Sequence, residues 1–281
     1  MARYSFSGHD SFHCKSLWLK KGYDFLSHEY NFNAPDAVAE LGVGKNMVNA
    51  IRYWLKSFGL TSNDKLTIIA DYLFHTETGR DKYAEDLTTL WLLHYLLVST
   101  NVASLYNLLF LSFQREKREF DKEQLLQFIK RKCDVPEQKN VYNENTINKD
   151  IKVMLQNYVM PIDLKSLDDF SALLINLNLI RKNEDKKYSF NSKSKDDVPS
   201  IIILYALIDL KGNDKTVSFD ILQDISLLFC MPITELIGII KKLEKDFPGV
   251  IAYNDNSGVR NVQFLRDIDK LEVLDNYYIA Q

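Results

Sequence analysis

The segment "GHDSFHC" concentrates ligand-type side chains within six residues: His9, Asp10, His13 and Cys14. Residues of these types bind zinc, and two histidines four residues apart on a helix can share one metal ion. The neighbouring glycine and serine favour a loop or a helix cap instead, and no second cluster completes a site. We therefore expect neither a metal site nor a catalytic site here. Asp10 is equally suited to cap the first helix.

The segment Gly42-Val43-Gly44-Lys45 has the residue types of a phosphate-binding loop. Such a loop requires G-x-x-x-x-G-K-[ST] after a buried strand, so that backbone N–H groups surround the phosphates. Here Ala39 occupies the first glycine position, Asn46 follows Lys45, and the preceding residues have the apolar spacing of a helix. The pattern argues against a nucleotide-using enzyme and favours a turn between two helices.

The helix predicted to follow this turn, Lys45–Phe58, has two distinct faces. Its apolar stripe consists of Val48, Ile51, Leu55 and Phe58. The opposite face carries Lys45, Asn46, Asn49, Arg52, Tyr53 and Lys56. Amides pair with adenine, and cations reach guanine or phosphate, so this face predicts a DNA-binding helix. Arg52 and Asn49 are the expected base contacts, and Lys45 and Lys56 the expected phosphate contacts. An ordinary solvated face of an amphipathic helix has the same composition.

Composition limits the possible classes of protein. The chain has 281 residues, of which 46% are hydrophobic, and this predicts well-packed globular cores. A net charge of -3 means that any DNA affinity must come from a local surface. Its three cysteines form no C-x-x-C pair, which predicts a cytoplasmic protein without zinc or disulfides. The apolar run "TTLWLLHYLLV" is too short to span a bilayer, so it predicts a buried helix and no membrane contact.

Apolar periodicity and turn residues predict a mostly α chain with small β-hairpin wings, arranged as tandem winged-helix-like units. Three helices followed by a hairpin recur along the sequence. The predicted ranges are an N-terminal winged-helix-like unit at 1–75, a helical connector at 76–135, a central helical or winged unit at 136–195, and a C-terminal winged-helix-like unit at 196–281. A polar, charged segment at Asn191–Ser200 is the expected linker before the last unit.

Several details of these units are specific predictions. Asn63-Asp64 is the expected tip of the first hairpin, and Asp255–Gly258 the expected turn of the last one. In the central unit, "SLDDFSALLINL" is read as a third helix, with Asp168 and Asp169 at its start, where negative charge favours the helix dipole. His94 is expected to be a core residue with one hydrogen-bond partner.

Five blocks resemble a bacterial family known as domain-of-unknown-function family 4007: "FSGHDSF…WLKKGYDF", "LGVGKNMVNAIRYWLKSFGL", "DKYAEDLTTLWLLHYLL", "YALIDL" and "SGVRNVQF…LDNYY". The resemblance implies a gene beside DNA sulfur-modification and phage-defence genes. Members are sometimes labelled phosphoadenosine phosphosulfate reductases, an activity that needs a phosphate loop and a cysteine in a Glu-Cys-Gly-type motif. The last cysteine here, Cys230, lies in apolar "LLFCMPI" and is expected to be buried and inert.

The residues and the resemblance together predict a non-enzymatic DNA-binding or DNA-targeting accessory protein that uses the Lys45–Phe58 helix and no cofactor. Its expected partners are double-stranded DNA and other proteins of a DNA-modification or defence complex. The alternative is a protein–protein interaction scaffold within such a complex, because winged helices also serve as docking modules. The sequence does not fix the oligomeric state.

Overall fold

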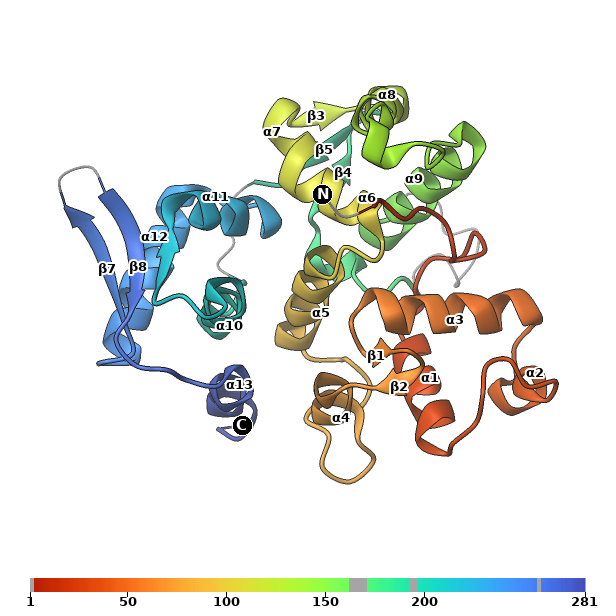
Figure 1. Cartoon of the computed structure of the whole chain (residues 1–281), viewed down its shortest axis with the longest axis horizontal. Coiled ribbons are helices and arrows are strands. Elements are labelled where there is room, and N and C mark those ends of the chain that lie inside the picture. The colour runs from red at the N-terminus through yellow and green to blue at the C-terminus, as the bar shows by residue number, and fades with distance from the viewer. Residues whose placement is uncertain (1–2, 162–170, 193–196, 257–258, 281) are drawn as a thin grey trace. The chain divides into compact units, whose positions relative to one another are not determined.

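The computed structural model describes residues 3–161, 171–192, 197–256 and 259–280. It is mostly helical with small antiparallel sheets, as predicted. Two compact units divide the chain, Met1–Asn191 and Ser192–Gln281 (Figure 1). Their boundary falls inside the predicted linker, of which residues 193–196 lie outside the described residues. Within the described part of the chain, no single helix has the length and apolar character needed to cross a membrane.

The first unit begins with helices that surround a short hairpin. These elements are α1 (Trp18–Ser27), α2 (Ala37–Leu41), α3 (Lys45–Ser57), β1 (Thr61–Ser62), β2 (Lys65–Leu66) and α4 (Ile68–Phe74). Helix α2 ends at Gly42, whose φ of 61° is left-handed, and α3 begins after Gly44. A helix therefore precedes this turn, as expected for a helical pair. Asn63 and Asp64 have φ values of 51° and 58°, which makes them the predicted hairpin tip.

A buried helical layer follows. Its elements are α5 (Leu87–Ser99), α6 (Ser104–Asn107), the π-helical segment η1 (Leu108–Phe113) and α7 (Gln114–Glu116). Helix α5 is the predicted buried helix, and the Asp86 side chain caps it by accepting a hydrogen bond from the Thr88 N–H at 2.7 Å. His94 is fully buried, and its Nδ1 lies 2.7 Å from the Tyr158 hydroxyl. The prediction of a core histidine is confirmed.

The rest of the first unit is a three-stranded sheet with two helices. The elements are β3 (Glu119–Phe120), α8 (Lys122–Cys133), the 3-10 turn η2 (Pro136–Gln138), α9 (Glu144–Tyr158), the 3-10 turn η4 (Ile175–Leu177), β4 (Ile180–Lys182) and β5 (Tyr188–Phe190). The strand order is β3-β5-β4, so the first strand pairs with the last.

The third helix predicted for this region is not present in residues 171–177, which form a bridge, a turn and η4. The remainder of that prediction, including Asp168 and Asp169, lies outside the described residues. The helix that precedes the two-helix pair is instead the α6–α7 stretch, before β3. Apolar residues at helical spacing here form no α-helix, because the backbone of residues 171–173 pairs with residues 14–16 instead: the Ser16 N–H donates to the Ser171 carbonyl at 2.7 Å and the Leu173 N–H to the Cys14 carbonyl at 2.9 Å.

The second unit follows the helical order predicted for it. Its elements are α10 (Ser200–Lys211), β6 (Thr216–Ser218), α11 (Phe219–Leu228), α12 (Ile233–Asp246), β7 (Ile251–Asn256), β8 (Val259–Phe264) and α13 (Lys270–Tyr278). Strand β6 pairs with β8, which also pairs with β7. The β7–β8 hairpin projects beyond the helices of its unit (Figure 1). Two residues of its predicted turn, Ser257 and Gly258, lie outside the described residues.

Candidate nucleic-acid interface

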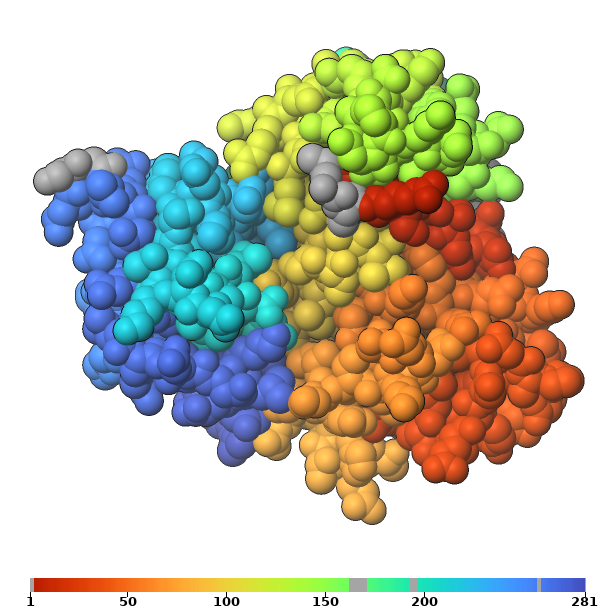
Figure 2. Space-filling view, viewed as in Figure 1, coloured from red at the N-terminus to blue at the C-terminus, as the bar shows by residue number. Residues whose placement is uncertain are grey.

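Helix α3 is oriented as its periodicity predicts. Val48, Ile51 and Leu55 are buried, and Phe58 directly after the helix is buried too. Helix α1 approaches this apolar face closely, because a Cβ on Gly22 would lie 2.6 Å from Leu55 Cδ1 and 2.7 Å from Ile51 Cγ2. The six predicted contact residues therefore share the opposite face of the helix. Figure 2 shows the N-terminal part of the chain, to which α3 belongs, in red to orange.

These six residues differ in solvent exposure and in ion pairing. Lys45, Asn46, Asn49 and Lys56 are exposed, whereas Arg52 and Tyr53 are half-buried. Neither Lys45 nor Lys56 makes an ion pair with another described residue. Both lysines are thus available for phosphate groups of a partner.

Arg52 is held by the hairpin tip. Its Nε donates to Asp64 Oδ1 at 2.9 Å, its Nη2 donates to the other Asp64 oxygen, and its Nη1 donates to Asn33 Oδ1 at 2.9 Å. The hydrogen bond to Asp64 raises the pKa of Arg52, so the guanidinium stays charged. Such a bidentate pair fixes the side chain, and Arg52 must exchange Asp64 for a base edge before it can read one.

Four of the predicted residues line one polar cavity of about 540 Å³. It is bounded by Gly8, Asn49, Arg52, Tyr53, Lys56, Thr61, Asn63 and Asp64. Lys45 and Asn46 lie outside this lining, at the start of the helix. The cavity presents two cations, two amides and one carboxylate. This donor-rich composition suits a phosphate or a base edge better than an apolar ligand.

Sequence reasoning missed four contributors to this cavity: Gly8, Thr61, Asn63 and Asp64. A Cβ on Gly8 would lie 2.4 Å from the Tyr53 ring, so only glycine permits this close approach. Asp64 was recognised as a turn residue, but its ion pair with Arg52 depends on how the hairpin folds back onto α3. The spacing of twelve residues between them carries no helical or strand period that would reveal it.

The "GHDSFHC" residues serve the fold. His9 Nε2 lies 2.8 Å from Asp150 Oδ1, and both side chains are buried. Asp10 accepts from Asn49 Nδ2 at 3.1 Å, and α1 has no side-chain cap, so the suggestion that Asp10 caps the first helix is wrong. Cys14 is buried, and its backbone N–H donates to Asn157 Oδ1 at 3.0 Å. Burial raises the pKa of the Cys14 thiol. No group of three or more metal-binding side chains occurs among the described residues.

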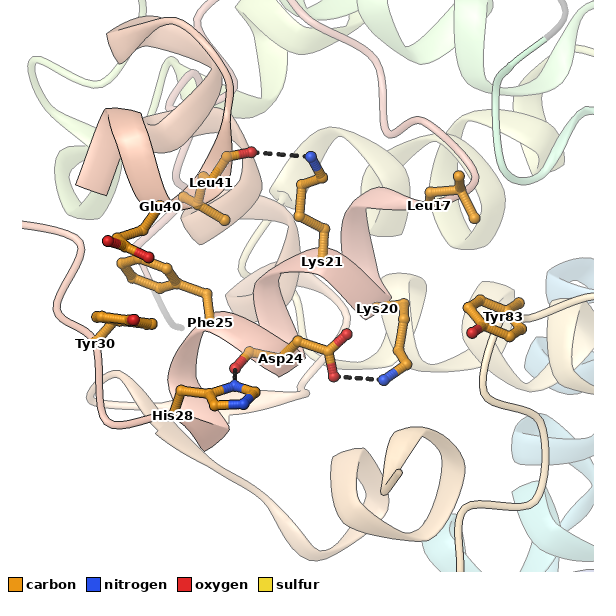
Figure 3. Close-up of a pocket in the computed structure, with 10 residues that line it drawn as sticks. All are labelled: Leu17, Lys20, Lys21, Asp24, Phe25, His28, Tyr30, Glu40, Leu41 and Tyr83. Atoms are coloured by element: carbon orange, nitrogen blue, oxygen red, sulfur yellow. Dashed lines mark hydrogen bonds and ion pairs between the residues drawn. The ribbon is translucent and has the colours of Figure 1, made fainter. Parts of the chain in front are cut away.

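A second cavity of about 330 Å³ lies between α1 and α2 (Figure 3). Its lysines are engaged: Lys20 pairs with Asp24, and Lys21 Nζ donates to the Leu41 carbonyl at 2.9 Å. Leu17 and Tyr83 also line it, and they are 57% and 52% exposed. This cavity offers apolar and aromatic surface rather than free cations.

Known proteins resemble this chain along nearly its whole length. The model of the family described as "Protein of unknown function (DUF4007)" matches residues 6–278. Among solved structures, one titled "SspB crystal structure" aligns with a TM-score of 0.83 at 27% identity, covering 98% of this chain and 88% of that one. Another, titled "Magnesium ion-bound SspB crystal structure", aligns with a TM-score of 0.81 at 26% identity and the same coverage. A search of curated proteins gave no match. The chain belongs to the DUF4007 family.

Proposed function

We propose that this chain is a non-enzymatic, cytoplasmic accessory protein that binds or targets duplex DNA for a DNA sulfur-modification or phage-defence system. One observation carries the proposal: the exposed lysines and amides of α3 adjoin a polar cavity closed by the β1–β2 hairpin. The family resemblance supports the biological setting. The likeness to the SspB structures supports the fold on which this face is built.

The proposal gives different tasks to the residues of α3. Lys45 and Lys56 neutralise phosphates, because they are exposed and lie near the two ends of the helix. Asn49 and Arg52 lie between them and are the base-reading candidates, each restrained by a carboxylate from another segment. Base reading by Asn49 or Arg52 must displace Asp10 or Asp64, so the proposal implies modest affinity. Two or three phosphate contacts imply a salt slope of about two to three.

The test is a fluorescence-anisotropy salt series with unmodified and sulfur-modified duplexes. Lys45→Ala/Lys56→Ala should flatten the slope of log affinity against log salt by about two, since each phosphate contact contributes about 0.9. The control, Lys122→Ala/Lys130→Ala, removes the same charge from exposed positions on α8 and should leave more of the slope intact. Absence of binding at low salt, or equal slopes for the two double variants, contradicts the proposal.

The non-enzymatic part needs its own test, because one similar structure is described as magnesium-bound. The same duplexes are incubated with the protein, with and without Mg²⁺, and the strands are then separated. We expect intact strands, no ATP hydrolysis and no stoichiometric zinc. Magnesium-dependent strand cleavage would replace an accessory role with an enzymatic one.

A scaffold function is the second candidate, and the cavity of Figure 3 favours it. Exposed Leu17, Tyr30 and Tyr83 frame that cavity, and aromatic residues of this kind are enriched at protein interfaces. Leu17→Asp/Tyr83→Asp should abolish co-purification of a partner protein while leaving the DNA salt slope unchanged. The reverse result favours the DNA proposal.

A further inference from the structure

The second unit has a helix face that the α3 proposal does not use. Its elements run helix, strand, helix, helix, strand, strand, and the first strand pairs with the last. This is the order of a winged helix, in which α12 takes the position of the recognition helix and β7–β8 that of the wing. Only Leu236, Ile240 and Leu243 of α12 are buried, so most of the helix surface is open.

The open face of α12 is basic. Thr234, Gly238, Lys241, Lys242 and Lys245 are exposed and fall on the side opposite the buried leucines and isoleucine, at 3.6 residues per turn. Glu235 and Glu244 are half-buried and fall to the flanks of this stripe. None of the three lysines forms an ion pair with another described residue. The stripe therefore presents three lysines without ion pairs, although Glu235, Glu244 and the exposed Asp246 at its edges carry an equal number of negative charges.

Gly238 lies in the middle of this stripe, and the fold gives no reason for a glycine there. A Cβ at this position would have no atom within 4 Å, and α12 is regular on both sides. Glycine destabilises a helix interior relative to alanine, so its presence in open space points to something that must approach the backbone closely. A nucleic-acid backbone or base edge flanked by lysines satisfies that requirement.

The wing extends the same surface. Lys241 Nζ lies 5.7 Å from the centre of the Tyr253 ring on β7, which joins the helix stripe to the hairpin. On β8, Arg260 lies 5.3 Å over the Phe219 ring and pairs with Asp255 at 3.2 Å. Asn254 donates to Asn261 at 3.0 Å across the two strands. Cations and amides thus follow one another from α12 onto the hairpin.

We infer that α12 and the β7–β8 hairpin form a second duplex-DNA-binding face, independent of the face on α3. Lysines of α12 contact phosphates on both sides of a groove, and Gly238 lets the helix descend into it. The hairpin lies along the adjacent backbone. The inference does not require the α3 proposal to be correct, because it rests on a different unit.

Full-length variants test it in the same anisotropy salt series. Lys241→Ala/Lys242→Ala/Lys245→Ala should flatten the salt slope by about two to three. The control Lys215→Ala/Arg266→Ala removes exposed cations of the same unit outside α12 and the hairpin, and should change the slope less. Gly238→Leu should lower affinity by at least about tenfold without lowering the melting temperature, because leucine favours a helix and the new side chain meets only solvent in the free protein.

The outcomes separate the two faces. If the α12 triple variant keeps the wild-type slope while Lys45→Ala/Lys56→Ala flattens it, the second face is refuted and the first stands. If the α12 variant alone flattens the slope, the second face stands and the α3 proposal falls. Independent contributions from both faces should add in the combined variant. Unchanged affinity of Gly238→Leu would refute the close approach of the helix.

Discussion

Helices α9 and α12 occupy equivalent places in two copies of one topology, yet their surroundings differ. In both, a strand precedes two helices and a hairpin follows, with sheet orders β3-β5-β4 and β6-β8-β7. Eight of the fifteen residues of α9 are buried, against three of the fourteen residues of α12. Equal topology therefore does not mean equal access to a partner.

The N-terminal segment of the chain contributes to this difference by covering Asp150 and Asn157 of α9. The Ser7 N–H donates to Asp150 Oδ2 at 2.8 Å, His9 bonds the other oxygen, and the Cys14 N–H donates to Asn157. Residues 7–14 thus cover a side of α9 that is polar in sequence. Described residues of its own unit do not cover α12 in this way, so Lys241, Lys242 and Lys245 stay exposed.

The largest expected effect concerns α3, which has one buried face and one largely exposed face. Ile51→Asp should destabilise the first unit by more than about 4 kcal/mol, because a carboxylate would be buried without a partner. Arg52→Ala should cost about 1 kcal/mol or less, since its ion pair with Asp64 is partly exposed. Urea unfolding followed by circular dichroism measures both. A milder effect at Ile51 than at Arg52 would mean that α3 faces the other way.

The next largest effect tests whether residues 7–14 stabilise the first unit by binding to α9. Asp150→Ala should cost about 3–5 kcal/mol, because His9 and the Ser7 N–H lose a buried acceptor. It should also make Cys14 react faster with a thiol reagent. Lys152→Ala, on the exposed side of the same helix, should stay within about 0.5 kcal/mol. If the two variants have equal stability, the N-terminal segment does not restrain α9.

Replacing two different glycines by alanine should change the free energy of unfolding in opposite directions. Gly22→Ala should destabilise the protein by about 1–3 kcal/mol, because the added Cβ overlaps Leu55 and Ile51. Gly238→Ala should stabilise it by about 0.5–1 kcal/mol, because alanine favours the helix and meets nothing. Thermal unfolding of the two variants checks the signs. A loss of stability at Gly238 would show that α12 has a neighbour on its basic side.

The smallest effect depends on pH. Burial, then the Asp150 charge, raises the pKa of Tyr53 in the folded state. Unfolded tyrosine ionises near pH 10, so its contribution to stability is complete below about pH 10 and is lost as pH rises further. Tyr53→Phe should therefore make stability less dependent on pH above about 10. An unchanged dependence would place the Tyr53 hydroxyl in solvent.

The sequence predicted correctly those parts of the fold that depend on residues close together in the chain. The facing of α3, the Asn63-Asp64 tip and the helices of the second unit follow from apolar spacing and turn residues. The short strands β3 and β6 escaped prediction because two or three residues cannot show a period of two, and their pairing is long-range: Glu119 lies opposite Ser189.

In the candidate site, too, features set by neighbouring residues could be predicted and features set by distant residues could not. Its helix face could be predicted, since lysines and asparagines recur at helical spacing. Its restraints could not, because Arg52 meets Asp64 and Asn49 meets Asp10 only after the hairpin and the N-terminal segment fold onto α3. Whether the six α3 residues contact DNA stays a prediction.

The bond between His9 and Asp150 spans 141 positions of sequence and sets an order of events during synthesis. The segment before α1 can meet α3 early, through Asp10 and Asn49, but Asp150 becomes available to His9 only when α9 has emerged. At about 5–20 residues per second, that delay lasts on the order of ten seconds. Throughout it, His9 and the Ser7 N–H lack their buried acceptor, so residues 7–14 complete their packing only after α9 has joined the first unit.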